Sequence, residues 1–200
     1  MSVRAFLIEA TGQARIYLRR NSAWGDAGSY HNAMNEIGVA QITFDADGNW
    51  SEPIAKEQPP HDDPRWPAVA DDGYVFQDFD HWQVFMDRIY RRADNGELTT
   101  LRTAPEGAIW RAEWCEDTPG WCGADGRCYV AKCPGGGDWM IDGRASNCTM
   151  KDDNVHKCWV RHGEAPNFTV DKNGVSCQAG AGSIQTHNWH GFLRNGEFVT

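Results

Sequence analysis

Cysteine and histidine are concentrated in the stretch Cys148-Thr-Met-Lys-Asp-Asp-Asn-Val-His-Lys-Cys-Trp-Val-Arg-His162, which carries two of each within fifteen residues. All seven cysteines of the chain lie between Cys115 and Cys177, and four of the seven histidines lie at or after His156. Thiolate and imidazole are preferred ligands of zinc. A metal or thiol site is therefore expected in the carboxy-terminal half, and the short alternating run His156–His162 is predicted to be a strand.

Cys148, His156, Cys158 and His162 are the candidate metal ligands, with zinc as the expected ion. Their spacing, C-x7-H-x-C-x3-H, is not that of a standard zinc finger. In one extended strand, His156 and His162 would share a face but lie about 20 Å apart, too far to bind one ion. Either the chain bends near Arg161, or His162 is replaced by a ligand from elsewhere, such as His187 or His190. Packed cysteines and hydrogen-bonded histidines without metal are the alternative.

The earlier cysteines, Cys115, Cys122, Cys128 and Cys133, contain no Cys-x-x-Cys pair. This argues against a zinc ribbon and against the usual dithiol redox motif. Pairing into disulfides, for example inside a mature extracellular particle, is the alternative to free thiols.

A cysteine hydrolase would need a thiolate beside an imidazole, and Cys177 with His187 or His190 is the arrangement that fits this requirement. A cysteine in a Gly-Val-Ser-Cys-Gln turn is more typical of a structural residue. We therefore predict no catalytic residue and keep these three as weak candidates.

Composition indicates a folded, turn-rich protein, because 200 residues include ten tryptophans and 21 glycines. The net charge of −9 argues against a nucleic-acid-binding surface, which is usually basic. No apolar run approaches the roughly 18 residues that span a bilayer, and the first residues do not have the pattern of a signal peptide. We expect no membrane and no nucleic acid among its partners.

Alternating apolar residues predict strands over most of the chain. Val3–Glu9 and Ala14–Arg20 are predicted to form a hairpin around residues 10–13. Gly38–Phe44 is predicted to be a strand that ends at the turn Asp45–Asn49. The run Asp78–Tyr90 fits a helix or a strand.

Turn residues predict further hairpins in the rest of the chain. Asn95-Gly96 predicts a hairpin between Ile89–Arg92 and Leu98–Leu101. Further strands are predicted, with glycine-rich turns between them, at Cys128–Lys132, Asp138–Ile141, Phe168–Val170 and Trp189–Leu193. The fold class is mainly β, with a β-rich α+β fold as a variant. It consists of short antiparallel strands and hairpins, many turns, and at most one or two helices.

Pro105-Glu106-Gly107 is the best candidate boundary, since every cysteine follows it. It divides the chain into an acidic β-rich region, 1–104, and a Cys/His/Gly-rich β region, 105–200; one continuous domain is the alternative. Residues 1–114 carry 11 basic and 18 acidic side chains, net −7, whereas the remainder carries 8 and 10, net −2.

Seven motifs, spread over most of the chain, resemble sequences in a group of uncharacterised proteins encoded by tailed bacteriophages. Members of that group often have a Cys-x-x-Cys pair before the position of Gly73–Phe76, where this chain has Val69-Ala-Asp-Asp72 and no cysteine. The motifs are Arg4-Ala-Phe-Leu-Ile-Glu-Ala-Thr-Gly12, Leu18-Arg-Arg-Asn21, Gly143-Arg-Ala-Ser-Asn-Cys-Thr149, Cys158-Trp-Val-Arg-His-Gly-Glu-Ala-Pro166, Thr169-Val-Asp-Lys-Asn-Gly174, Ala179-Gly-Ala-Gly-Ser-Ile-Gln185 and Trp189-His-Gly-Phe-Leu-Arg-Asn-Gly196.

This resemblance implies a phage-encoded protein. The expected function is that of a non-enzymatic, virion-associated head or tail accessory protein, with other phage structural proteins as partners and with an oligomer as one arrangement. The expected location is the virion or the host cytoplasm. The alternatives are a metal- or cysteine-dependent intracellular enzyme and a protein-binding factor that takes over the host.

Overall fold

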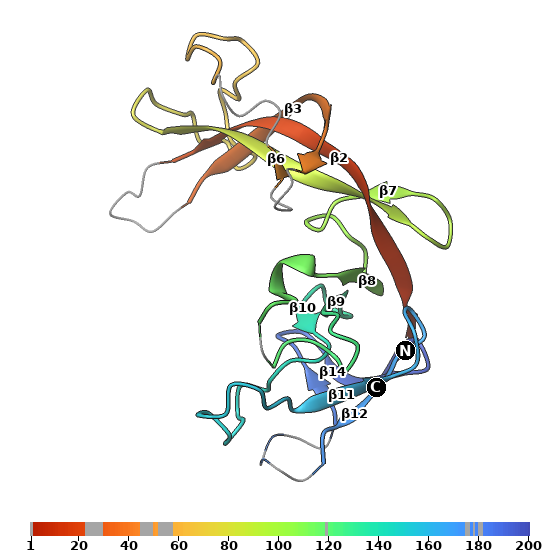
Figure 1. Cartoon of the computed structure of the whole chain (residues 1–200). Helices are drawn as coiled ribbons and strands as arrows, with labels where there is room; N and C mark the ends of the chain where they lie inside the picture. The colour runs from red at the N-terminus through yellow and green to blue at the C-terminus, as the bar shows by residue number, and fades with distance from the viewer. Residues whose placement is uncertain are drawn as a thin grey trace. The chain divides into compact units, whose positions relative to one another are not determined.

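The computed structural model describes residues 2–22, 30–44, 50–51, 58–118, 120–174, 177, 179 and 182–200. Within them the chain forms fifteen strands and one 3-10 turn, η1 (Glu113–Cys115), with no α-helix (Figure 1). The predicted mainly β fold is therefore confirmed. The ambiguous run Asp78–Tyr90 is largely strand, because β6 covers His81–Arg92. No helix among the described residues is long and apolar enough to cross a membrane.

The strands vary from two residues to sixteen. Their bounds are β1 (Val3–Arg4), β2 (Phe6–Asn21), β3 (Asn32–Gln41), β4 (Thr43–Phe44), β5 (Trp50–Ser51), β6 (His81–Arg92), β7 (Leu98–Thr99), β8 (Ala108–Arg111), β9 (Tyr129–Lys132), β10 (Asp138–Met140), β11 (Trp159–His162), β12 (Thr169–Lys172), β13 (Ile184–Gln185), β14 (His190–Arg194) and β15 (Glu197–Val199).

The chain divides into two compact units. The first unit contains residues 1–9, 91–99 and 103–200, and the second contains residues 10–90 and 100–102. Residues 1–9 belong with the carboxy-terminal part because β1 pairs with β15 and the start of β2 pairs with β8. Pro105, where the sequence changes character, lies inside the first unit.

The predicted hairpin at the amino terminus is wrong, because β2 runs without a break through residues 10–13. The glycine of the expected turn, Gly12, keeps a positive φ of 76° inside the strand. Thr11 donates its hydroxyl proton to the Ile89 carbonyl at 2.8 Å. Within the second unit β2 lies between β3 and β6, so its backbone groups pair with those strands and not with an earlier part of β2.

The second unit is built on this β3-β2-β6 arrangement. Ala14, Ile16 and Leu18 alternate along β2 and are almost completely buried, as the pattern predicts. Arg20 is also buried; it donates to the Gln77 carbonyl at 2.9 Å, and its guanidinium lies 3.6 Å from the centre of the Trp82 ring. The strands β4 and β5 pair across the predicted turn Asp45–Asn49, which itself lies outside the described residues.

The first unit contains every cysteine of the chain. Its sheets have the strand orders β1-β15-β14-β13 and β10-β9-β8-β2, and β11 pairs with β12 beside them. Two predicted hairpins are confirmed: β9 with β10, and β6 with β7 across Asn95-Gly96. A further hairpin joins β14 to β15 across Asn195 and Gly196, whose positive φ values of 49° and 72° suit a tight turn. The core contains Ile109, Ala131, Trp139, Ile141, Phe168, Ile184, Leu193 and Phe198.

The predicted strand His156–His162 is shorter than expected. β11 begins at Trp159, so His156 and Cys158 precede it in a turn. In an extended strand, His156 and Cys158 would project separately from the same face. The turn instead brings their ligand atoms together. β11 and β12 lie side by side in Figure 1, with Trp159 opposite Lys172 and His162 opposite Thr169.

Candidate metal centre

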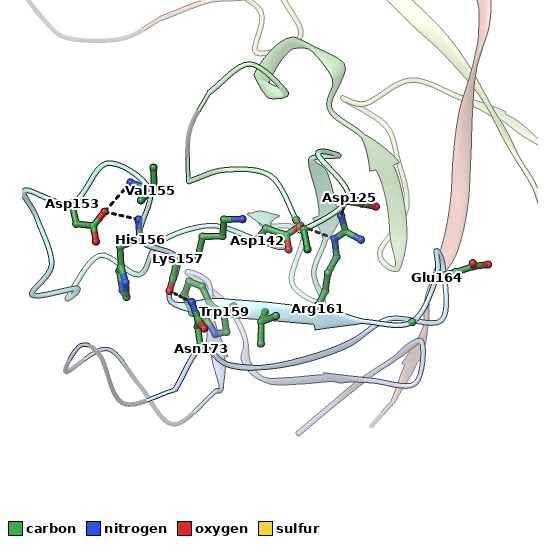
Figure 2. Close-up of a pocket in the computed structure, with 14 residues that line it drawn as sticks. Asp125, Asp142, Asp153, Val155, His156, Lys157, Trp159, Arg161, Glu164 and Asn173 are labelled. Carbon is green, nitrogen blue, oxygen red and sulfur yellow. Dashed lines mark hydrogen bonds and ion pairs between the residues drawn. The ribbon is translucent and has the colours of Figure 1, made fainter.

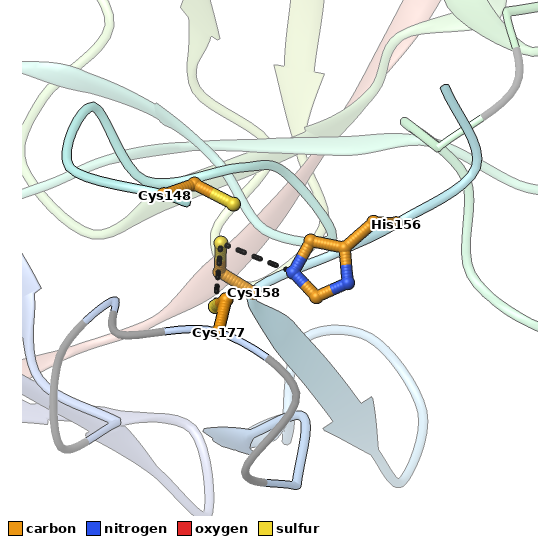
Figure 3. Close-up of side chains that lie close together, drawn as sticks. All are labelled: Cys148, His156, Cys158 and Cys177. Atoms are coloured by element: carbon orange, nitrogen blue, oxygen red, sulfur yellow. Dashed lines mark hydrogen bonds between the residues drawn. The ribbon is translucent and has the colours of Figure 1, made fainter. Parts of the chain in front are cut away.

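Four side chains of the first unit converge in a group that could hold a metal ion such as zinc: Cys148, His156, Cys158 and Cys177 (Figure 3). One ligand atom from each lies within 4.8 Å of every other. Cys158 Sγ lies 3.8 Å from His156 Nε2 and 3.8 Å from Cys177 Sγ. Ligand atoms around tetrahedral zinc, with bonds of about 2.0 to 2.3 Å, lie roughly 3.3 to 3.8 Å apart. The group therefore has close to the size that this ion requires.

Cys148 is held in a turn by its own backbone. Its amide donates to the Ala145 carbonyl at 3.1 Å, and the Met150 amide donates to Cys148 Sγ at 3.4 Å. An amide that points at a sulfur stabilises the thiolate, which is the form that binds metal.

His156 is positioned by an aspartate turn. Asp153 Oδ1 accepts hydrogen bonds from the amides of Val155 and His156 at 3.0 and 3.1 Å, as Figure 2 shows. The guanidinium of Arg144 donates to the carbonyls of Asp153 and His156. An Asp side chain that bonds the amides following it is a common local alternative to a strand ladder. This explains why the strand begins only at Trp159.

Cys158 and Cys177 are brought together by the β11–β12 hairpin. The Cys158 amide donates to the Gly143 carbonyl at 3.1 Å, and its carbonyl accepts from the Asn173 amide at 2.9 Å. Asn173 also donates its side-chain amide to the Lys157 carbonyl at 3.0 Å. The chain therefore leaves β12 beside Cys158, and Cys177 follows four residues after Asn173.

The cluster is shielded from solvent. Cys148 and Cys158 are 3% exposed, and Cys177 and His156 are 8% exposed. Burial raises the pKa of Cys158 to about 12, and the neighbouring Cys148 and Cys177 thiols add to this effect. Burial also acts on Cys148, but the Met150 amide, the nearby thiols and Arg144 outweigh it and lower the pKa of that thiol. Cys148 therefore loses its proton more readily than Cys158 does.

Three of the four residues predicted as ligands belong to the group, and His162 does not. The His162 side chain is 58% exposed at the end of β11, and its Nε2 lies 3.3 Å from Asp171. Cys177, considered from sequence only as a nucleophile, takes the fourth place. His187 and His190 are exposed and lie outside the group.

A polar cleft of about 610 Å³ lies beside the cluster (Figure 2). Its charges bind one another: the buried Arg161 guanidinium donates to the buried Asp142 at 2.7 Å and to the half-exposed Asp125 at 2.5 Å. The same guanidinium lies over the rings of Tyr129 and Phe168, 4.8 and 5.1 Å from their centres. This network fixes β11 against the neighbouring turns.

Comparison with models of protein families found no match, and comparisons with curated proteins and with solved structures found none either. Three thiols and one imidazole form a donor set that suits zinc and other thiophilic ions.

Proposed function

We propose that this chain is a non-enzymatic β protein of a tailed bacteriophage, associated with the virion as a head or tail accessory protein, and that zinc bound by Cys148, His156, Cys158 and Cys177 stabilises its first unit. The observation that most strongly supports a structural zinc site is that the cluster supplies four protein ligands, all largely buried.

The number of ligands favours a structural role for the metal. Structural zinc sites are closed by four protein ligands, whereas catalytic sites keep one position for water or substrate. A Cys3His set leaves no such position. The ion would connect the turn at Cys148, the segment before β11 and the loop after β12, which also pack against one another through Met150, Trp159 and Ala179.

The same geometry disfavours a cysteine hydrolase. Cys177 Sγ lies 3.8 Å from Cys158 Sγ inside the cluster, where zinc would bind it as a thiolate. The histidines that would have served as its base, His187 and His190, are exposed and are not among the cluster's members. A zinc site closed by four protein ligands leaves no coordination position for a substrate.

The virion assignment is supported by the resemblance of seven motifs to proteins of tailed phages and by the turn-rich β architecture. Mass spectrometry of purified mature particles tests it. We expect peptides of this chain to remain with particles through gradient purification, at a constant ratio to the major capsid protein. Peptides found only in the infected-cell extract, and absent from the particles, would overturn the assignment.

A further inference from the structure

A second group of cysteines in the first unit differs from the Cys3His cluster of Cys148, His156, Cys158 and Cys177. Cys122 and Cys128 place their sulfur atoms 2.8 Å apart. A disulfide bond is about 2.05 Å long, so the two atoms are about 0.8 Å from bonding distance. From these contacts we propose that Cys122 and Cys128 are the site of an intramolecular disulfide, formed by exchange with a small-molecule disulfide, a modification separate from the proposed function.

The chain between these cysteines is a tight turn that holds them opposite each other. The Gly123 amide donates to the Arg127 carbonyl at 2.9 Å, and the Gly126 amide donates to the Gly123 carbonyl at 3.1 Å. Cys122 and Cys128 therefore flank a closed five-residue loop. Little loop entropy has to be lost when they are joined, because the turn already brings the two ends together.

The rest of the first unit keeps the turn in place. The Lys157 ammonium group donates a hydrogen bond to the Cys122 carbonyl, and the Arg161 guanidinium donates to the Arg127 carbonyl at 3.0 Å. The Arg161 guanidinium also lies where a side chain at Gly123 would stand. These contacts hold both ends of the turn on the same neighbouring segment.

The hydrogen bonds of the Cys122 and Cys128 thiols distinguish them from the thiols of the Cys3His cluster. Cys122 donates to the Glu116 carbonyl at 3.1 Å, and Cys128 donates to the Cys115 carbonyl at 3.3 Å. A thiol that donates to a carbonyl is protonated. In the Cys3His cluster, by contrast, the Met150 amide donates to Cys148 Sγ. Among the described residues, Cys122 and Cys128 are in no group of side chains suited to a metal.

Cys115 is the third thiol nearby, and its geometry disfavours it as a partner. Its sulfur donates to the Ala112 carbonyl at 3.1 Å, the carbonyl that precedes η1. Cys133 is fully buried in the main apolar core. The sulfur contact at 2.8 Å thus selects Cys122 and Cys128.

The exchange reaction takes two steps. Cys122, 8% exposed, loses its proton and attacks one sulfur of the small disulfide, which releases one thiolate and leaves a mixed disulfide on Cys122. Cys128 then loses its proton and attacks Cys122 Sγ, which releases the second thiolate. The two protein thiols are oxidised, the small disulfide is reduced to two thiols, and the two protons pass to the released thiolates. Burial and the neighbouring Cys122 and Cys115 thiols raise the pKa of Cys128, so the fully buried Cys128 is the later of the two to react.

Peptide mapping tests the proposal in the full-length protein loaded with zinc. The protein is incubated with oxidised glutathione, quenched in acid, alkylated in denaturant and digested with trypsin. Trypsin cleaves after Arg127, so the disulfide would join the peptide that contains Cys115 and Cys122 to the peptide Cys128–Lys132. Fragmentation of the joined peptides identifies which of Cys115 and Cys122 remains alkylated.

We expect joined peptides with Cys115 alkylated and Cys122 bound to Cys128, and the other four cysteines alkylated. Seven alkylated cysteines, or a bond from Cys128 to Cys115 or Cys133, would overturn the proposal. Two single variants test the order of attack. Cys128→Ser should trap glutathione on Cys122, whereas Cys122→Ser should leave Cys128 free of glutathione; the reverse pattern would contradict the mechanism.

Discussion

The two cysteine groups of the first unit have similar burial but different chemistry. In the Cys3His cluster, Cys158 Sγ lies 3.8 Å from both a thiol and an imidazole nitrogen, and a backbone amide donates to Cys148. In the other group, Cys122 Sγ and Cys128 Sγ lie 2.8 Å apart, and both thiols donate to carbonyls. The number of cysteines does not separate a metal site from a disulfide site. The separation of the sulfur atoms, the presence of histidine and the direction of the hydrogen bonds do.

The two groups also differ in how the chain builds them. Cys122 and Cys128 meet across one local turn, whereas the Cys3His cluster needs the β11–β12 hairpin to bring Cys177 to Cys158. Loss of a bound ion should therefore affect a larger part of the first unit than loss of the disulfide.

Replacement of a zinc ligand should have the largest effect. In Cys158→Ser we expect loss of bound zinc and loss of cooperative unfolding of the first unit, because structural zinc contributes on the order of 10 kcal/mol to small zinc-binding domains. Trp159 packs against the cluster, so near-ultraviolet circular dichroism should report the change. Thermal melts monitored by this signal, with zinc analysis of the same samples, provide the measurement.

The matched control is a histidine from the same stretch. His162→Ala removes an exposed side chain whose ion pair with Asp171 is also exposed, so it should change the free energy of unfolding by no more than about 0.5 kcal/mol and retain zinc. Equal zinc loss in Cys158→Ser and His162→Ala would contradict the assignment of the ligands.

Arg161 lies between the two cysteine groups, because it follows Cys158 in β11 and its guanidinium donates to the Arg127 carbonyl. Loss of its ion pair with Asp142 should have the next largest effect. Asp142 is 1% exposed, and its carboxylate accepts from Arg161 at 2.7 Å. Asp142→Ala leaves the buried guanidinium with fewer partners and should cost about 3 to 5 kcal/mol in urea unfolding. Asp138→Ala, which removes a half-exposed partner of Lys132, should cost less than about 1 kcal/mol. A cost for Asp142→Ala as small as that for Asp138→Ala would show that the network does not stabilise the unit.

Oxidation of Cys122 and Cys128 should have a smaller, stabilising effect. The disulfide closes a loop of seven residues, for which the chain-entropy model gives about 2 kcal/mol. Urea unfolding of the oxidised and reduced forms, both with zinc bound, measures the difference. The same oxidation treatment applied to Cys122→Ser should leave the unfolding midpoint unchanged. A midpoint that rises equally in that variant would assign the stabilisation to another site.

Glu116 should make the second group sensitive to acid. Two hydrogen bonds from Arg111, each 2.7 Å long, lower the pKa of Glu116, although burial opposes them. Because the pKa is lower in the folded protein, the stabilisation is present above the unfolded-state pKa of about 4.3 and disappears as the pH falls through the folded value. Arg111 is nearly half exposed, so we expect at most about 1 kcal/mol. Glu116→Gln should therefore destabilise the protein at pH 7 but not at pH 2; an equal cost at both values would exclude this pH dependence.

The local features of the fold could be predicted from the sequence. Alternating residues at Ala14–Arg20 and the Asn95-Gly96 pair predicted a strand and a hairpin that the structure contains. Two expectations failed because tertiary contacts override local signals. Thr11 and Gly12 suggested a turn, but the Thr11 hydroxyl bonds to the Ile89 carbonyl in a continuous strand. Asp153 bonds the amides ahead of Trp159 and shortens the predicted strand.

The candidate site could be predicted in part. Cys148, His156 and Cys158 are close in sequence, so their spacing indicated a common site. Cys177 is nineteen residues beyond Cys158, and it becomes a neighbour only after β11 pairs with β12. The pairing of Trp159 with Lys172 would have identified Cys177 as the fourth ligand. This pairing returns the chain to Cys158 shortly before Cys177.

The central claim is that zinc, bound by Cys148, His156, Cys158 and Cys177, closes the first of the two cysteine groups. Elemental analysis of the protein purified without chelator, combined with a count of reactive thiols in the folded state, tests it most directly. The account predicts one zinc per chain, released together with rapid thiol reactivity when a chelator is added, and a Cys177→Ser variant with strongly reduced zinc content. A metal-free protein with all seven thiols present, or full zinc content in Cys177→Ser, would contradict it.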